Sequence, residues 1–130
     1  MKVKIASNAY YLPEKKEGNK DLLLDNPDWD MSKIAEKTGI SSRSIASSSQ
    51  TAVDLAFEAG SKLLNDVSSK EDIDLIILVT QSPDYVLPTS ACILQDRLGL
   101  SNKCMAFDIN LGCSGFIYAL SIVGSLIESG

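Results

Sequence analysis

The stretch Asp108-Ile-Asn-Leu-Gly-Cys-Ser-Gly-Phe-Ile-Tyr-Ala-Leu120 decides how this chain folds, because it joins a strand pattern to a helix pattern. The run Cys104–Ile109 at its start is short and apolar, as is typical of a strand. The residues of Ser114–Glu128 are apolar on nearly every side and include no proline, which predicts a buried helix. Cys113 therefore stands where a strand turns into a helix.

Cys113 is the candidate nucleophile of this chain. A thiol at a helix N-terminus faces unpaired backbone N–H groups and the positive end of the helix dipole, which favour the thiolate. The same N–H groups can hold a developing oxyanion when the thiolate attacks a carbonyl. Gly112 and Gly115 fit this arrangement, since a sharp strand-to-helix turn needs relaxed backbone angles and close backbone approach. The alternative is that Cys113 simply packs, and the sequence holds no histidine to pair with it.

The composition is that of one soluble globular domain over residues 1–130, with 45% hydrophobic and 22% charged residues. The net charge of −5 argues against binding to nucleic acid or an anionic membrane. Phe116–Ile127, the longest nearly apolar stretch, is expected to be too short to span a bilayer, and the N-terminus lacks a signal-peptide pattern. The three cysteines have no C-x-x-C spacing, which argues against structural zinc or a disulfide framework and favours a reducing cytoplasm. Cys92 and Cys104 are assigned to structure.

From Leu75 onward, the order strand–helix–strand–helix predicts an α/β arrangement with parallel strands and helices packed on the sheet. Ligands in such sheets bind at the carboxyl ends of strands, where both Cys113 and the loop Gln81–Pro88 lie. The other predicted elements are a strand at Val3–Ser7, a loop at Glu14–Asn19, a helix at Lys20–Leu24 capped by Asn19, a helix from Ser32 to Thr38 ended by Gly39, a serine-rich loop at Ile40–Gln50, a helix from the Thr51/Asp54 capping box to Leu64, a connector at Val67–Asp72, a strand at Leu75–Thr80 and a helix at Ser90–Leu98 capped by Thr89.

With these residues in place, the central stretch resembles the active-site segment of β-ketoacyl-acyl-carrier-protein synthase III, in the thiolase-like condensing-enzyme superfamily. Three further segments agree in order and separation: Tyr11-Leu-Pro13, Thr38-Gly-Ile40 with Arg43 and Ile45-Ala46, and Pro88-Thr-Ser-Ala91. The resemblance covers essentially the whole chain. It implies an α/β fold, the N-terminal half of the duplicated α-β-α-β-α layered thiolase-like fold.

The resemblance implies a function as well. Cys113 would take an acyl group from a coenzyme A thioester, its backbone N–H supplying one oxyanion donor. In the family, a histidine and an asparagine of the C-terminal half help to decarboxylate malonyl-acyl-carrier-protein. The carbanion that forms then attacks the acyl-enzyme. A glycine of the same half completes the oxyanion hole. None of these three has a counterpart in this chain, so the fragment alone is expected to be inactive. Coenzyme A is a substrate here and no cofactor is implied.

Several positions depart from the family pattern. Members that use acetyl-CoA have a tryptophan that stacks on the adenine, followed by an arginine. The corresponding positions of this chain are Lys33 and Lys37. Trp29 lies one helical turn before Lys33. Trp29 either shares this coenzyme A site or is a packing aromatic. Leu87 stands where the family often has a phenylalanine. In the homodimer of the family, that phenylalanine bounds the acyl pocket of the partner subunit. Leu87 either favours a primer other than acetyl or simply packs at the subunit contact. The two subunits would pair through the Cys104–Ile109 strand.

Three functions fit these observations. The first is a decarboxylative Claisen condensation that begins fatty-acid or related chain synthesis, with acyl-CoA and acyl carrier protein as partners. The second keeps the acyl-Cys113 step but transfers the acyl group to an amine or hydroxyl in a secondary pathway. The third is a non-catalytic subunit of the same fold that binds a partner through its apolar surface.

Overall fold

The structure is a computed structural model that describes residues 3–130, and its contacts divide the chain into two compact units. The first unit is the chain up to Tyr11 together with Thr51–Gly130, and the second is Leu12–Gln50. The assignment of residues 1–130 to one domain stays a prediction.

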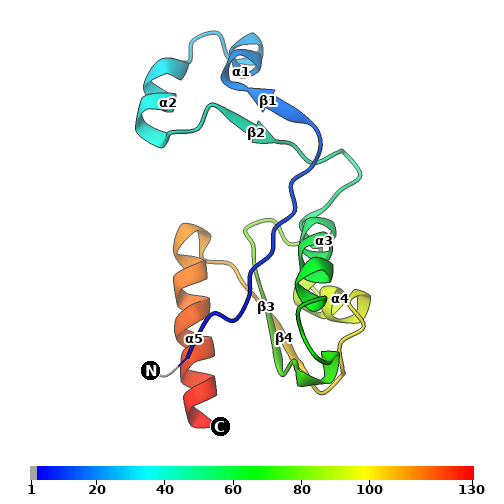
Figure 1. Ribbon diagram of the computed structural model, residues 1–130. Helices are drawn as coiled ribbons and strands as arrows, with labels where there is room; N and C mark the ends of the chain where they lie inside the picture. The colour runs from blue at the N-terminus through cyan, green and yellow to red at the C-terminus, as the bar shows by residue number, and fades with distance from the viewer. Residues whose placement is uncertain (1–2) are drawn as a thin grey trace. The chain divides into compact units, whose positions relative to one another are not determined.

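The first unit is built on two parallel strands, β3 (Leu75–Val79) and β4 (Met105–Ile109), which pair in register from their first residues to their last. Aliphatic side chains fill β3, as expected for a strand with neighbours on both faces. Figure 1 shows helix α5 (Gly115–Ser129) on one side of the strands, and α3 (Ala52–Leu64) and α4 (Ser90–Arg97) on the other. This arrangement confirms the predicted parallel α/β order and places the turn between β4 and α5 at the carboxyl ends of both strands.

The core lies between α3, α4 and the strands. Helix α3 begins as predicted, because the Thr51 hydroxyl accepts a hydrogen bond from the Asp54 amide and the Asp54 carboxylate accepts one from the Thr51 amide. Its second residue, Val53, is fully buried. The buried cluster that holds the two helices to β4 consists of Val53, Leu94, Leu98, Leu100 and Cys104.

Helix α4 starts after Thr89 as predicted, but the hydrogen bonds that cap it differ from those expected. Thr89 is the N-cap residue, but its side chain makes no capping hydrogen bond and its hydroxyl donates instead to Cys92 Sγ at 3.3 Å. The amides of Ser90 and Ala91 donate to the carboxylate of Asp108, which comes from β4. A carboxylate is the stronger acceptor and complements the helix dipole, so a distant residue takes the role that the local pattern gave to Thr89. A 3-10 turn (η1, Lys70–Asp72) lies inside the predicted connector before β3.

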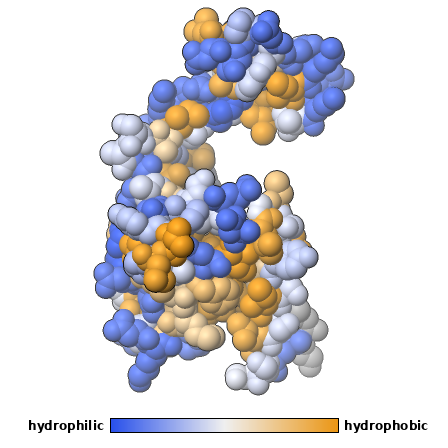
Figure 2. Space-filling view, turned by 180° about the vertical axis from the view of Figure 1, so that it is seen from behind, coloured by the Kyte–Doolittle hydropathy of each residue, from blue (hydrophilic) through white to orange (hydrophobic). Residues whose placement is uncertain are grey.

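The prediction that the helix over Ser114–Glu128 is buried was wrong for the described residues: of α5 only Gly115, Ala119 and Gly124 are buried, because no layer covers the outer face of the helix. Its exposed large side chains are Phe116, Ile117, Tyr118, Leu120, Ile122, Leu126 and Ile127. Figure 2 shows hydrophobic side chains gathered at the surface of the unit that carries the strands. The hydroxyls of Ser125 and Ser129 donate to the helix's own carbonyls, those of Ser121 and Leu126.

The segment Gly112–Ser129 is long and apolar enough, by length and composition, to cross a membrane. This segment is longer than Phe116–Ile127, the stretch expected to be too short, because the uncharged turn before α5 extends the apolar stretch to 18 residues. The core helix of a soluble protein passes the same test, so the finding is weak evidence for a membrane span.

The second unit pairs β1 (Lys16–Gly18) with β2 (Ser42–Ser44) in an antiparallel ladder. Both strands fall in segments that were predicted to be loops, Glu14–Asn19 and Ile40–Gln50. That prediction was wrong because the residues are polar and carry no alternating pattern, whereas the pairing depends on two segments far apart in the sequence.

Two short helices complete the second unit. Helix α1 (Asn19–Asp25) starts at Asn19, so Gly18 and not Asn19 is its N-cap. Helix α2 (Met31–Thr38) is capped by Asp30, whose carboxylate accepts from the Lys33 amide, so the prediction of Ser32 as the cap was also wrong. The Ser32 hydroxyl donates to the same carboxylate. Gly39 ends the helix as predicted, with φ of 70° in the left-handed region.

The predicted strand at Val3–Ser7 does not form. These residues join no sheet, because among the described residues β3 pairs only with β4, and the Ser7 hydroxyl donates instead to the Asp66 carboxylate at 2.7 Å. A strand pattern becomes a strand only when a neighbouring chain supplies the ladder hydrogen bonds.

Candidate active site

Cys113 is the central residue of a single 3-10 turn, η2 (Gly112–Ser114), which leads directly into α5. Its side chain is exposed and its thiol is free. The turn follows the carboxyl end of β4, as the sequence predicted. The Ser114 hydroxyl donates to the Leu111 carbonyl at 3.0 Å and so closes the turn from within. An exposed thiol at the start of a long helix has access to ligands from solution.

The two glycines around Cys113 fit the geometry predicted for them. Gly112 has φ of 59°, a backbone conformation that costs glycine little and other residues more. Gly115 is buried, and a Cβ built there would lie 2.6 Å from Val79 Cγ1 and 3.6 Å from Ile109 Cγ2. Only a glycine lets the first turn of α5 approach the ends of both strands this closely. The glycines thus set the position from which Cys113 projects.

Gln81 lies beside the Cys113 turn, although no pattern in the sequence marks this residue individually. It follows β3 closely and opens the loop Gln81–Pro88. A Cβ at Gly112 would lie 3.2 Å from Gln81 Nε2, so the side-chain amide rests against the residue that precedes Cys113. The far end of the same loop leads into α4, whose first amides bind Asp108.

Asp108 is the second residue that sequence reasoning missed as part of the site. Its two carboxylate oxygens accept from the Ser90 amide at 2.9 Å and from the Ala91 amide at 2.7 Å. The sequence shows Asp108 as an acidic residue near the end of a predicted strand and close to the start of a predicted helix. The tertiary fold decides which helix this carboxylate caps. The consequence is that loop Gln81–Pro88 is held at both ends against the segment that carries Cys113.

The other two cysteines lie in structural surroundings. Cys104 is buried in the core cluster, and burial, followed by the charge of Asp74, raises the pKa of its thiol. Cys92 is partly buried, and its thiol lies 3.8 Å from the Ala106 carbonyl. Over residues 3–130, no group of three His, Cys, Asp or Glu side chains is arranged to hold a metal ion.

Leu87 lies near the end of the loop Gln81–Pro88, and 84% of its surface is exposed. Its neighbours Tyr85 and Val86 are exposed as well. Three successive large apolar side chains in solvent form an apolar tip on this loop. The tip belongs to the same unit as Cys113, which places Leu87 and Cys113 on one body.

Trp29 and Lys33 lie together in the second unit. With Asp28, Asp30 and Ile34 they line a shallow depression of about 430 Å³. Helix α2 begins at Met31, so Trp29 reaches this position from the preceding loop and not from an extended helix. Lys33 forms an ion pair with Asp30 at 3.0 Å, and the hydroxyl of Ser32, followed by Lys33, lowers the pKa of Asp30. Lys37 is exposed in the last turn of α2 and does not line the depression.

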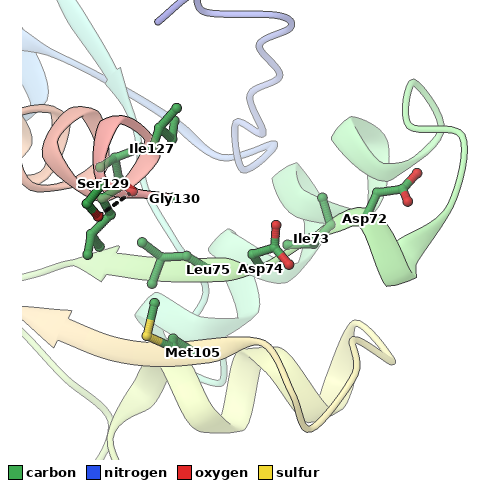
Figure 3. A pocket seen from close by; sticks show the side chains of 10 residues that line it. Asp72, Ile73, Asp74, Leu75, Met105, Ile127, Ser129 and Gly130 are labelled. Atoms are coloured by element: carbon green, nitrogen blue, oxygen red, sulfur yellow. Dashed lines mark hydrogen bonds between the residues drawn. The ribbon is translucent and has the colours of Figure 1, made fainter. Parts of the chain in front are cut away.

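A hollow of about 780 Å³ in the first unit lies away from Cys113. Leu75 and Met105, the first residues of β3 and β4, line it together with the last turns of α5 (Figure 3). Cys113 follows the opposite ends of the strands. The candidate active site is therefore a surface turn and not this hollow.

Known proteins resemble the chain throughout its length. A β-ketoacyl-acyl-carrier-protein synthase III from Xylella fastidiosa is 44% identical over 98% of this chain and 39% of its own length. One from Caldanaerobacter subterraneus is 46% identical over 97% of this chain and 38% of its own length. No family model matches the chain. The chain spans about two fifths of the length of these relatives and corresponds to their N-terminal part.

Solved structures give the same result for the fold. A crystal structure of a 3-oxoacyl-acyl-carrier-protein synthase III matches with a TM-score of 0.86 and 50% identity, over 97% of this chain and 38% of that one. The synthase III of Thermus thermophilus matches with a TM-score of 0.85 and 35% identity, over 98% and 39% of the two chains. OleA of Xanthomonas campestris matches with a TM-score of 0.82 and 30% identity, over 97% and 40%. The thiolase-like α/β fold and the resemblance to synthase III are therefore confirmed, and the chain is similar to a family of condensing enzymes.

Proposed function

We propose that this chain provides the nucleophile of a β-ketoacyl-acyl-carrier-protein synthase III-like acyltransferase, and that the nucleophile is Cys113. The observation that carries the proposal is the exposed, free thiol on a tight turn between a parallel strand and a long helix. The names of the relatives support the class of reaction. Cys92 and Cys104 are less exposed than Cys113, which makes them weaker candidates for the same role.

The proposed first step is acyl transfer from acyl-CoA. The Cys113 thiolate attacks the thioester carbonyl carbon, a new C–S bond forms, and the bond to the coenzyme A sulfur breaks. The negative charge on the carbonyl oxygen develops beside the amides that open α5, where backbone N–H groups and the helix dipole stabilise it. Coenzyme A leaves as the thiolate and takes up a proton.

The proposed second step joins two carbons. Malonyl-acyl-carrier-protein loses carbon dioxide, and the carbanion that remains attacks the carbonyl carbon of acyl-Cys113. The Cys113 thiolate is the leaving group, so the cysteine is regenerated and the β-ketoacyl-acyl-carrier-protein is released. The 130 residues contain no histidine, so no histidine of this chain assists the decarboxylation.

Recognition of coenzyme A is assigned to Trp29, Lys33 and Lys37. Half of the surface of Trp29 is exposed, at 49%, next to Lys33 in the same depression, so an adenine ring can stack on the indole. Lys37 adds a second exposed positive charge to the same helix. The two aspartates of the depression work against a phosphate, which limits this site to the nucleoside end of the ligand.

A homodimer in the cytoplasm completes the proposal. Among the described residues β4 pairs only with β3, so the free edge of β4 is available to the same strand of a second copy. The exposed apolar side chain of Leu87 then bounds the acyl pocket of the partner subunit and favours a primer other than acetyl. The free thiols of all three cysteines are consistent with a reducing compartment.

The proposal is tested with the protein expressed together with whatever sequence naturally follows Gly130. Incubation with acyl-CoA should add the mass of one acyl group to the peptide that carries Cys113, and Cys113→Ala should remove this product while the circular dichroism spectrum stays unchanged. Release of carbon dioxide from malonyl-acyl-carrier-protein then shows the condensation. Acylation of Cys92 in place of Cys113 would overturn the assignment.

A second candidate function keeps the acyl-Cys113 step and transfers the acyl group to an amine or hydroxyl. The chain is also similar to a tetronic acid condensing enzyme, with a TM-score of 0.78 and 31% identity over 95% of this chain, a name that supports a product other than a fatty acid. Under this reading the acyl-enzyme forms, but malonyl-acyl-carrier-protein loses no carbon dioxide.

A further inference from the structure

The loop Gln81–Pro88 is attached at both ends to the segment that runs from Asp108 to Cys113. At its start, the Gln81 side chain rests against Gly112. At its end, the chain enters α4, and the amides of Ser90 and Ala91 bind the carboxylate of Asp108. The loop that carries Leu87 and the turn that carries Cys113 are therefore joined by side-chain contacts as well as by the ladder between β3 and β4.

The Asp108 attachment is the stronger of the two. Both carboxylate oxygens are used, at 2.9 Å to the Ser90 amide and 2.7 Å to the Ala91 amide. Such hydrogen bonds to an ionised acceptor are stronger than those between neutral groups, and the dipole of α4 adds to them. An asparagine at this position could accept only through one oxygen and would turn a donor toward the second amide.

A second set of bonds carries the attachment into the loop itself. The Ser90 hydroxyl is fully buried and accepts from the Asp84 amide at 3.1 Å, in the middle of the loop. The Asp84 carboxylate in turn accepts from the Val53 amide at 3.4 Å, at the start of α3. A path of hydrogen bonds thus runs from Asp108 on β4 through Ser90 to Asp84, three residues before Leu87.

We propose that Asp108 is a positioning residue for acyl selectivity, which acts through Ser90 and Asp84 on the placement of Leu87. The inference rests on the proposed acyl-transfer function and deepens it. Asp108 touches no reacting atom in this account. Its role is to fix the loop that bears Leu87 relative to β4, the strand through which the two subunits pair in the proposed homodimer, so that the acyl pocket of the partner subunit keeps one length. Small displacements of a group that bounds a substrate change rates by large factors.

The test compares acylation of Cys113 by acetyl-, butyryl- and hexanoyl-CoA, in the protein expressed with its natural continuation beyond Gly130. Asp108→Asn should speed hydrogen exchange at the Ser90 and Ala91 amides about tenfold, because a charge-assisted bond is lost. It should also change the ratio of the acylation rates for the three chain lengths about tenfold. Thr89→Val is the matched control, since it alters the same helix start without touching the Asp108 bonds, and the ratio should stay as in the unmodified protein.

Two further variants separate positioning from loss of stability. Ser90→Ala removes the bond to Asp84 while α4 keeps its carboxylate cap, and it should change the ratio in the same direction as Asp108→Asn. In a Leu87→Ala background, Asp108→Asn should change the ratio no further, since the two residues act through one path.

Each outcome has a definite meaning. An unmodified protein that is not acylated at Cys113 by any of the three substrates overturns the proposed function and this inference with it. An unmodified protein that is acylated, with the same ratio in Asp108→Asn and Ser90→Ala, overturns the inference alone. Equal effects of Thr89→Val and Asp108→Asn also overturn it, because a general weakening of α4 would then explain both.

Discussion

Gly115, the first residue of α5, lies directly against Val79, the last residue of β3: a Cβ on Gly115 would be 2.6 Å from Val79 Cγ1. Real Cβ atoms do not approach other atoms this closely, so a larger residue would force the helix away from the strand. The contact fixes the start of α5 on the sheet, and with it the turn that presents Cys113.

Gly115→Ala should therefore destabilise the protein by about 1–3 kcal/mol, the usual effect of overpacking a tight core. Urea unfolding measures the change. The double variant Val79→Ala with Gly115→Ala makes room for the added methyl group and should be more stable than the sum of the two single changes predicts. Additive effects would show that the contact is not what limits the approach.

Gly112→Ala should cost more stability than Gly39→Ala, although both glycines have positive φ angles of 59° and 70°. Each change carries a backbone cost of about 1 kcal/mol. A Cβ at Gly39 meets nothing within 4 Å, whereas one at Gly112 lies 3.2 Å from Gln81 Nε2, so Gly112→Ala also displaces a side chain. Urea denaturation of both variants makes the comparison, and an equal loss would mean that Gln81 moves aside freely.

Iodoacetamide should alkylate Cys113 about tenfold or more faster than Cys104, because Cys113 is exposed whereas Cys104 is buried with a raised thiol pKa. Cys92, which is partly buried, should also react more slowly than Cys113. Mass spectrometry of peptides from the folded protein gives the three rates, and denatured protein is the control in which the rates should converge. Equal rates in the folded protein would argue strongly against Cys113 as the nucleophile.

Coenzyme A should quench the fluorescence of Trp29, which is the single tryptophan of the chain and is half exposed. The reason is stacking of adenine on the indole ring. Pantetheine, which lacks the adenine, is the matched control and should leave the emission unchanged. Lys33→Ala should weaken the quenching, and quenching of equal size by pantetheine would mean that Trp29 does not contact the nucleotide.

The Asp54 carboxylate should make a stabilising contribution that is lost in acid. The amide of Thr51, followed by the side chain of Arg97 at 2.7 Å, lowers the pKa of Asp54 below its ordinary value of 3.8. A lowered folded-state pKa means that the contribution is complete above the ordinary value and disappears as the pH falls through the folded value. The stability difference between the protein and Asp54→Asn should thus be constant near neutral pH and shrink below about pH 4. A difference that does not change with pH would refute this account.

The features that depend on local sequence could be predicted, and those that depend on distant partners could not. Helix α3 was predicted from Thr51 to Leu64 because its capping box lies within four residues, and the turn at Cys113 followed from a strand, two glycines and a helix in succession. Strands β1 and β2 were not predicted, because their residues are polar and show no strand pattern. They become strands only by pairing with each other, and α1 and α2 lie between them in the sequence.

The same distinction between local sequence and distant partners holds for the residues of the candidate site. Cys113 could be identified from its neighbours in sequence, whereas Asp108 and Gln81 acquire their place from contacts with Ser90 and Gly112. Trp29 lies one helical turn before Lys33 in the sequence and α2 does not extend back to it, yet the two residues share a depression because the loop before α2 brings the indole there.

The serines of α5 have a consequence for the surroundings that this helix can tolerate. Ser125 and Ser129 donate their hydroxyls to carbonyls of the helix itself, at 3.0 Å and 2.9 Å. A hydroxyl that is satisfied within its own helix makes no demand on a neighbour. A layer that packs over these two turns therefore needs no hydrogen-bond acceptor for the two hydroxyls. It can be entirely apolar there without leaving a buried donor unsatisfied.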